Sequence, residues 1–270
     1  RVANALPLLG AGEIEPAGIF VARTPDALAG VQVCIPLRGS SGLFWLPQVD
    51  PSWHDTDLAE QLVQAALAWL RMRGAKLAQA LVHPGELANA AALTRCGFQH
   101  ITRLQYLRHT LDLVPPLSDD SALQLQSFTA GIEQAFQQTL LRTYEGTLDC
   151  AELNGVRTIE EVIDGHRAQG IWHPETWWLA AVDGEPAGVA MLTELADGDG
   201  WDLSYVGVAP EFRGRGLGRS LALHAMAVAK NRGALQLLVA VDQRNEPARR
   251  LYEALGFEPT EGREIFLLIL

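Results

Sequence analysis

The sequence predicts an α/β (α+β) protein made of two copies of one unit, each a mixed, mostly antiparallel sheet flanked by helices. One observation behind this prediction is an internal repeat at a constant offset of 159 residues. Another is that the residue pattern of the second copy predicts an antiparallel meander followed by alternating strands and helices. The chain has 270 residues, 48% of them hydrophobic, which is enough for one large or two modest domains.

The repeat keeps turn glycines and apolar positions in one register, without a gap, over about sixty positions. Matching pairs are Pro51 with Pro210, Leu58 with Leu217, Gly74 with Gly233, Val82 with Val241, and Gly97-Phe98 with Gly256-Phe257. Such a constant register indicates two copies of one supersecondary unit.

The boundary between the copies is expected at residues 113–120, where Pro115 and Pro116 oppose both helix and sheet pairing. The predicted division is therefore a domain at 1–112, a linker at 113–120 and a domain at 121–270. Residues 1–112 hold nine Lys/Arg and nine Asp/Glu, whereas the rest holds twelve and 23. The whole net charge of −11 thus belongs to the second half.

The second copy begins with a long segment, residues 131–170, of largely helical pattern. Its apolar residues at helical spacing are Ile132, Phe136, Leu140 and Leu141. An apolar run predicts a strand at 177–182, and Asp183-Gly184 predicts a hairpin turn into a strand at 187–195. A further strand is expected at 202–208.

The remaining elements alternate. Leu217, Leu221, Ala225 and Val228 lie on one face of a helix expected at 217–230, which ends before Gly233. A buried strand is predicted at 235–241, a helix at 247–255 and a last strand at 265–270.

Composition excludes several classes. The net charge of −11 argues against a nucleic-acid surface. The chain lacks an uninterrupted run of about 18 apolar residues, so we expect no membrane span. Cys34, Cys96 and Cys150 are far apart and the seven histidines form no ligand pair, so we expect no metal site and a reducing, cytoplasmic compartment. The chain starts at Arg1, which leaves a removed targeting segment open.

The most informative segment joins the strand ending at Val208 to the helix starting at Leu217. A helix start offers unpaired N–H groups to a phosphate, and glycines let a pyrophosphate approach the backbone. The loop supplies three glycines and three arginines, namely Gly214, Gly216, Gly218, Arg213, Arg215 and Arg219. A Walker A loop would need a lysine, and a Rossmann loop would need G-x-G-x-x-G in a βαβ unit, so neither fits.

The hexapeptide Arg213–Gly218 resembles the R/Q-x-x-G-x-G/A motif of the GNAT superfamily of acyl-CoA-dependent N-acyltransferases. Val208-Ala209-Pro210 before it, and Asn245 and 251–257 (Leu-Tyr-Glu-Ala-Leu-Gly-Phe) after it, are also in the family's pattern and order. The resemblance covers residues 176–270 well and, through the repeat, residues 43–111 at the level of fold. It implies two tandem GNAT-like domains with acetyl-CoA as co-substrate.

The resemblance also implies site residues. The strands at 202–208 and 235–241 should diverge and admit the pantetheine arm. The residues expected to bind acetyl-CoA are Val206, Val208, Arg213, Gly214, Arg215, Gly216, Leu217, Gly218, Arg219 and Asn245, with a plain helix cap as the alternative for Asn245.

Direct attack of an amine on the thioester needs a base, and the leaving thiolate needs an acid. By family analogy Tyr252 protonates the thiolate. Asp202, six residues before Val208, stands where some family members carry a catalytic glutamate. The alternatives are a water relay, Glu194 on the adjoining strand, or no role for Asp202.

In GNAT proteins the region between the first helix and the second strand usually builds the acceptor pocket. Here that region suggests Tyr144, Asp149 and Glu152 as acceptor-facing residues, with a surface loop as the alternative. Cys150 is expected to be a packed thiol rather than an acyl carrier.

The first copy has lost the corresponding groups. His54, Asp55, Asp57 and Ala59 stand where the second copy has Arg213, Gly214, Gly216 and Gly218, and Leu93 replaces Tyr252. The first domain is therefore expected to be a degenerate copy, an arrangement that resembles the mycothiol synthase family, whose C-terminal domain is active.

The resulting expectation is acetyl transfer from acetyl-CoA to a primary amine by the C-terminal domain. The acceptor is a small-molecule or peptide amine, with no nucleic acid or membrane as partner. A non-catalytic CoA-binding regulator and a protein or peptide N-terminal acetyltransferase are the alternatives.

Overall fold

A computed structural model describes residues 15–116, 123–196, 198 and 200–270. The C-terminal half of the expected linker, residues 117–120, lies outside the described residues. The chain forms two compact units. Unit 1 comprises residues 1–103, 155–157 and 262–270, and unit 2 comprises 104–154 and 158–261. These units differ from the sequence-based division at residues 104–112, 155–157 and 262–270.

Unit 1 has strands in the order β1-β2-β3-β5-β12, with β4 paired to β2. Its elements are β1 (Ile19–Arg23), β2 (Leu28–Leu37), β3 (Ser41–Phe44), β4 (Gln48–Val49), α2 (Leu58–Met72), β5 (Leu77–Val82) and α3 (Ala91–Arg95). The apolar stripe of α2, which includes Val63, Leu67 and Leu70, is fully buried in the core of this unit.

Unit 2 has strands in the order β6-β11-β10-β9-β8-β7. Its elements are β7 (Leu123–Ser127), α4 (Glu133–Thr143), α5 (Ile159–Arg167), β8 (Trp177–Val182), β9 (Glu185–Glu194), β10 (Trp201–Val208), α6 (Leu217–Asn231), β11 (Leu237–Asp242) and α7 (Glu246–Ala254). These bounds agree closely with the sequence predictions. Leu141, expected on the buried face of α4, is instead 49% exposed, because Phe136 and Leu140 already fill that face.

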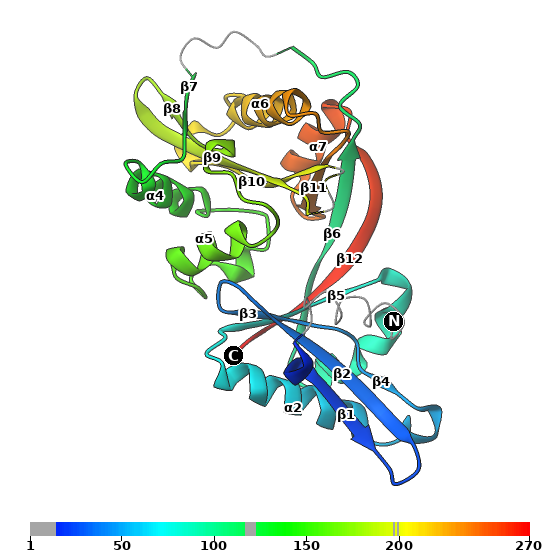
Figure 1. Ribbon diagram of the computed structural model, residues 1–270. Helices are drawn as coiled ribbons and strands as arrows, with labels where there is room; N and C mark the ends of the chain where they lie inside the picture. Colours follow the sequence, from blue (N-terminus) through cyan, green and yellow to red (C-terminus); the bar gives the residue numbers. More distant parts are fainter. Residues whose placement is uncertain (1–14, 117–122, 197, 199) are drawn as a thin grey trace. The chain divides into compact units, whose positions relative to one another are not determined.

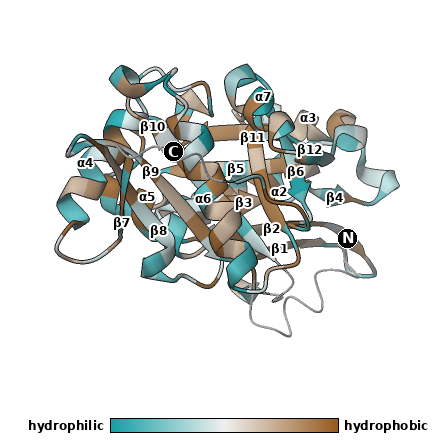
Figure 2. Ribbon diagram, turned by 90° about the horizontal axis from the view of Figure 1, so that it is seen from above, coloured by the Kyte–Doolittle hydropathy of each residue, from teal (hydrophilic) through white to brown (hydrophobic). Residues whose placement is uncertain are grey.

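Two apolar cores lie on the two faces of the sheet in unit 2 (Figure 1). One contains the buried residues of α6 and α7, and the other contains Phe136 and Leu140 of α4, Ile163 of α5 and Trp177 of β8. In Figure 2 the strands carry hydrophobic stretches, and β11 is apolar from Leu237 to Val241 before it ends in Asp242. Helices therefore cover both faces, as expected for a mixed sheet of this class.

The last strand of each repeat pairs within the other unit. β6 (Gln99–His109) runs antiparallel to β11, with Leu107 opposite Val239. β12 (Glu258–Ile269) runs antiparallel to β5, with Phe266 opposite Ala80. The sequence predicts a last strand in this region, beginning at residue 265, but not this exchange of partners.

No helix among the described residues has both the length and the apolar composition needed to cross a membrane.

Candidate active site

The two central strands of unit 2 diverge. β10 pairs with β9 along its length but with β11 only at Trp201–Leu237 and Asp202–Leu238. An irregularity between Leu203 and Tyr205 shifts the register of β10 where the divergence begins. The expected opening between 202–208 and 235–241 is therefore present. An edge of this kind can accept an extended ligand as an added strand.

The glycine-rich loop lies at the end of the diverging β10. Gly214 and Gly216 have φ values of 75° and 85°, a region that favours glycine, and Gly216 is the N-cap of α6. A Cβ atom added to either would meet nothing within 4 Å, so open space adjoins the backbone. Together with the first N–H groups of α6, including those of Leu217 and Gly218, the loop can hold an anion.

The three loop arginines have different surroundings. Arg219 is exposed. Arg215 is also exposed; its Nη2 donates to the Glu211 carbonyl at 2.8 Å and its guanidinium lies 5.3 Å from the Phe212 ring centroid. Arg213 instead directs four hydrogen bonds to backbone carbonyls of unit 2. Its guanidinium is thus occupied by the protein itself.

Asn245 is the N-cap of α7. Its Oδ1 accepts a hydrogen bond from the Ala248 N–H at 3.2 Å. The capping alternative is therefore observed, and contact of Asn245 with the CoA arm stays a prediction.

The structure brings Asp202, Tyr252 and Asp149 into one electrostatic environment. Burial raises the pKa of Asp202 to about 7, which suits a group that accepts a proton near neutral pH. Tyr252 is buried, and desolvation together with the negative charges of Asp149 and Asp202 raises its pKa well above the usual range. Tyr252 therefore stays protonated and can only donate.

Glu194, the alternative base, is already engaged. Its Oε2 lies 2.7 Å from His173 Nε2, and the His173 ring stacks on Trp201. Glu194 is opposite Trp201 in the β9–β10 register, whereas Asp202 is opposite Thr193. Because directly opposed residues share a face, Glu194 and Asp202 lie on opposite faces of the sheet.

The acceptor candidates lie in a segment that follows α4. The ring of Tyr144 packs edge-on against Tyr205, and Glu152 forms an ion pair with Arg244 at 2.6 Å. Desolvation and the neighbouring Asp242 carboxylate raise the pKa of Asp149 to about 6, and the charge of Asp149 in turn raises the pKa of Tyr252.

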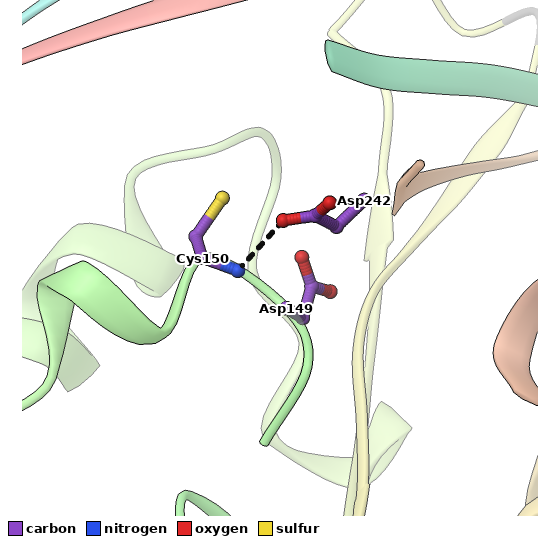
Figure 3. A group of neighbouring side chains, drawn as sticks. All are labelled: Asp149, Cys150 and Asp242. Carbon is purple, nitrogen blue, oxygen red and sulfur yellow. Dashed lines mark hydrogen bonds between the residues drawn. The ribbon is translucent and has the colours of Figure 1, made fainter. Parts of the chain in front are cut away.

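Asp242 and Arg244 are site residues that the sequence predictions missed. Asp242 is fully buried at the end of β11 and accepts from Arg244 Nη2 at 2.7 Å and from the Cys150 N–H at 3.1 Å (Figure 3). The sequence does contain a signal for Asp242: it directly follows the buried strand predicted at 235–241, where that strand is expected to diverge from the one at 202–208. With Asp149 and Glu152, the region holds three carboxylates around the Arg244 cation.

Cys150 lies in the same group of side chains (Figure 3). Its backbone is left-handed, with φ of 43°, and burial with the nearby carboxylates raises the pKa of its thiol to about 12. The thiol therefore stays protonated at neutral pH, as expected for a packed group rather than a nucleophile.

Tyr205 was also missed, because the sequence places it in the middle of an ordinary strand. Its hydroxyl lies 2.7 Å from Thr143 Oγ1, and its ring contacts Tyr144 and His166. The register shift at residues 203–205 aims this ring at the α4 side of the sheet.

Comparison with known proteins places this site in a family. The model of the Acetyltransferase (GNAT) family matches residues 141–257, which hold the diverging strands, the glycine loop and Tyr252. The mycothiol acetyltransferase of Thermobifida fusca is 30% identical over 79% of this chain and 71% of its own, and that of Thermobispora bispora is 32% identical over 86% and 77%.

Solved structures share the fold. A GCN5-related N-acetyltransferase from Sphaerobacter thermophilus has a TM-score of 0.65 at 20% identity, over 93% of this chain and 80% of its own. A tandem GNAT protein from the clavulanic acid biosynthesis pathway has a TM-score of 0.55 at 17% identity, over 97% and 86%. From its relatives and its matched site, this chain belongs to the GNAT family and is an acyl-CoA-dependent acetyltransferase that transfers acetyl to an amine.

Proposed function

We propose that unit 2 acetylates the primary amine of a small-molecule acceptor of the mycothiol type, by direct attack on acetyl-CoA. The observation that carries this proposal is the divergence of β10 from β11 beside a glycine-rich helix start, with the charges of Asp149 and Asp202 both acting on the buried Tyr252. The acceptor class rests on relatives named mycothiol acetyltransferase at 30% and 32% identity.

The proposed mechanism assigns one role to each group. The pantetheine arm adds to the open edge of β10 at Val206 and Val208, and the pyrophosphate lies on the N–H groups from Gly214 to Gly218. Asp202 takes the proton from the attacking ammonium, directly or through a water. The neutral amine attacks the thioester carbonyl to give a tetrahedral intermediate, whose collapse breaks the C–S bond. Tyr252 gives its proton to the departing thiolate and takes back the second proton that the acceptor nitrogen loses as the amide forms.

The carboxylates near the site suit a cationic acceptor. Asp149, Glu152 and Asp242 outnumber Arg244, the cation that pairs with two of them. An ammonium beside them is stabilised, and the local negative charge favours its approach. The acidic excess of residues 113–270 supports the same preference. Nothing in this reaction requires a metal ion.

The first copy takes no part in the proposed chemistry. Its loop offers Asp55 and Asp57 where a pyrophosphate needs glycines, and Leu93 lacks a proton to give. We propose that it is a degenerate domain kept for packing. The unpaired Cys34, Cys96 and Cys150 support a cytoplasmic, reducing compartment.

The experiment is incubation of the full chain with acetyl-CoA and a panel of amines, followed by mass spectrometry of the products. The panel holds mycothiol without its acetyl group, simple polyamines and short peptides with free N-termini. We expect acetylation of the mycothiol precursor and no peptide product. If only peptides were acetylated, the acceptor would be a peptide amine instead of a small molecule. If CoA bound but no amine were acetylated, the chain would be better described as a non-catalytic CoA-binding regulator.

A further inference from the structure

Arg213 has the sequence position of a phosphate-binding arginine, but its side chain hydrogen-bonds to backbone carbonyls of two neighbouring segments. Its Nε donates to the Val208 carbonyl at 3.0 Å, and its Nη1 to the Gly146 carbonyl at 3.3 Å. Its Nη2 donates to the carbonyls of Thr143 at 3.0 Å and Glu145 at 2.7 Å. A guanidinium has five N–H donors, so four are used within the protein. The backbone N–H of Arg213 is also used, by the Pro210 carbonyl at 3.2 Å.

These contacts join the glycine loop to the C-terminal end of α4. The last carbonyls of a helix have no partner inside the helix, and a cation there is favoured by the helix dipole. A second arginine crosses in the opposite direction: Arg142 of α4 forms an ion pair with Glu211 of the loop and donates to the Pro186 carbonyl at 3.0 Å. The end of α4 is therefore fixed to the loop from both sides.

The segment that leaves this end of α4 is residues 144–154, which we call the acceptor strap. Its far part is fastened to the other diverging strand, because the Cys150 N–H donates to Asp242 and Glu152 pairs with Arg244. The strap thus starts at a contact with the loop after β10 and reaches the end of β11. Tyr144, Asp149 and Glu152 all lie on it.

We propose that Arg213 is a positioning residue for the acceptor, holding the acceptor strap to the glycine loop, rather than a ligand of the CoA pyrophosphate. This inference rests on the proposed function of the site. Its physical basis is that one guanidinium holds four backbone carbonyls, three of them at residues 143–146, where the strap that carries Asp149 begins, and the charge of Asp149 acts on Tyr252. Arg215, exposed in the same loop and with one side-chain hydrogen bond to a backbone carbonyl, is the matched arginine for contact with the phosphates.

The test compares the variants Arg213→Ala, Arg213→Lys and Arg215→Ala in the full chain. We expect Arg213→Ala to raise the acceptor KM about tenfold or more, while the Kd of CoA by calorimetry changes less than about twofold. Arg213→Lys should not restore the acceptor KM, because an ammonium cannot serve four carbonyls in one plane. Arg215→Ala should do the reverse, weakening CoA binding with little change in acceptor KM. A large rise in the CoA Kd for Arg213→Ala with an unchanged acceptor KM overturns the inference.

Hydrogen exchange gives a second readout that needs no turnover. In Arg213→Ala the amides of residues 144–154 should exchange faster than in the parent chain, while those of β8 and α6 keep their rates. Uniformly faster exchange throughout unit 2 would mean a general loss of stability and would contradict a local effect of Arg213 on residues 144–154. If no amine in the panel is acetylated, the proposed acceptor fails, but the exchange result still decides the role of Arg213.

Discussion

At the scale of single residues, the proposed mechanism uses Asp202 as the base and Tyr252 as the acid, and burial raises the pKa of both. Burial raises the pKa of Asp202 to about 7, so it exchanges its proton near neutral pH. Burial and two nearby carboxylates raise the pKa of Tyr252, so it keeps its proton. A base and an acid are thus separated by environment, which is the usual way to assign such roles.

Tyr252→Phe should lower kcat by about 100-fold, because a positioned general acid contributes about 10²–10⁴ in rate. The CoA Kd should change less than about twofold, since the ring and its packing on Phe257 remain. Steady-state kinetics with calorimetry for CoA checks both. Unchanged kcat would remove Tyr252 from the mechanism.

Asp202→Asn should raise the melting temperature at about pH 8 and leave it nearly unchanged at about pH 4. The folded pKa of about 7 exceeds the ordinary value of 3.8, so the folded state binds this proton more tightly than the unfolded state does. The contribution of protonated Asp202 to the free energy of unfolding is fully present below about pH 4 and is lost as the pH rises through about 7. Asparagine cannot ionise and avoids this loss. Scanning calorimetry at both pH values checks it, and equal melting temperatures at about pH 8 would contradict a buried, ionisable Asp202.

At the scale of elements, the divergence of β10 from β11 and the turn into α6 create the ligand site. The strands pair at two positions and then part, and Gly216, with φ of 85°, is the N-cap of α6, the helix that follows β10 and the glycine loop. The backbone rather than any side chain supplies most of the expected anion contacts.

Gly216→Ala should weaken acetyl-CoA binding about tenfold or more, because alanine disfavours this backbone conformation and its methyl group occupies the open space. Gly184→Ala is the matched control: it has φ of 82° in the β8–β9 hairpin and equally open surroundings. Both should lose about 1 kcal/mol of stability. Calorimetry should find weaker CoA binding only for Gly216→Ala, and equal loss in both would assign the effect to stability alone.

At the scale of the whole molecule, the exchange of β6 and β12 ties the two repeats together. The strand after α3 of the first copy completes the sheet of unit 2, and the strand after α7 of the second copy completes that of unit 1. Strand β6 of the first copy therefore has a structural role in unit 2, since its Leu107 is part of the core of that unit.

This exchange predicts that both units unfold together. Leu67→Ala, in the fully buried core of unit 1, should cost about 2–5 kcal/mol and should lower the temperature at which acetyl-CoA binding is lost from unit 2. Thermal unfolding should show one transition, and acetyl-CoA should shift all of it upward. Two transitions, of which acetyl-CoA moves only one, would contradict the coupling.

The sequence predicted most elements of unit 2 and the position of the glycine loop, because periodicity and turn glycines are local signals. It could not predict the exchange of β6 and β12, since the partner of a strand depends on contacts between residues that are far apart in the sequence. It assigned Arg213 by motif, whereas the contacts of its side chain depend on where α4 ends. Asp242 and Arg244 acquire their surroundings only when β11 and the acceptor strap meet.

The central claim, that Asp202 is the base of an acetyl transfer in unit 2, is tested most directly by the pH dependence of kcat/KM for the acceptor. It should be measured from about pH 5 to about pH 9 in the parent chain and in Asp202→Asn. We expect kcat/KM of the parent chain to fall about tenfold per pH unit below about pH 7. For Asp202→Asn we expect a much lower kcat/KM that does not fall in this way at acid pH. An identical fall at acid pH and comparable rates in both proteins would contradict the claim.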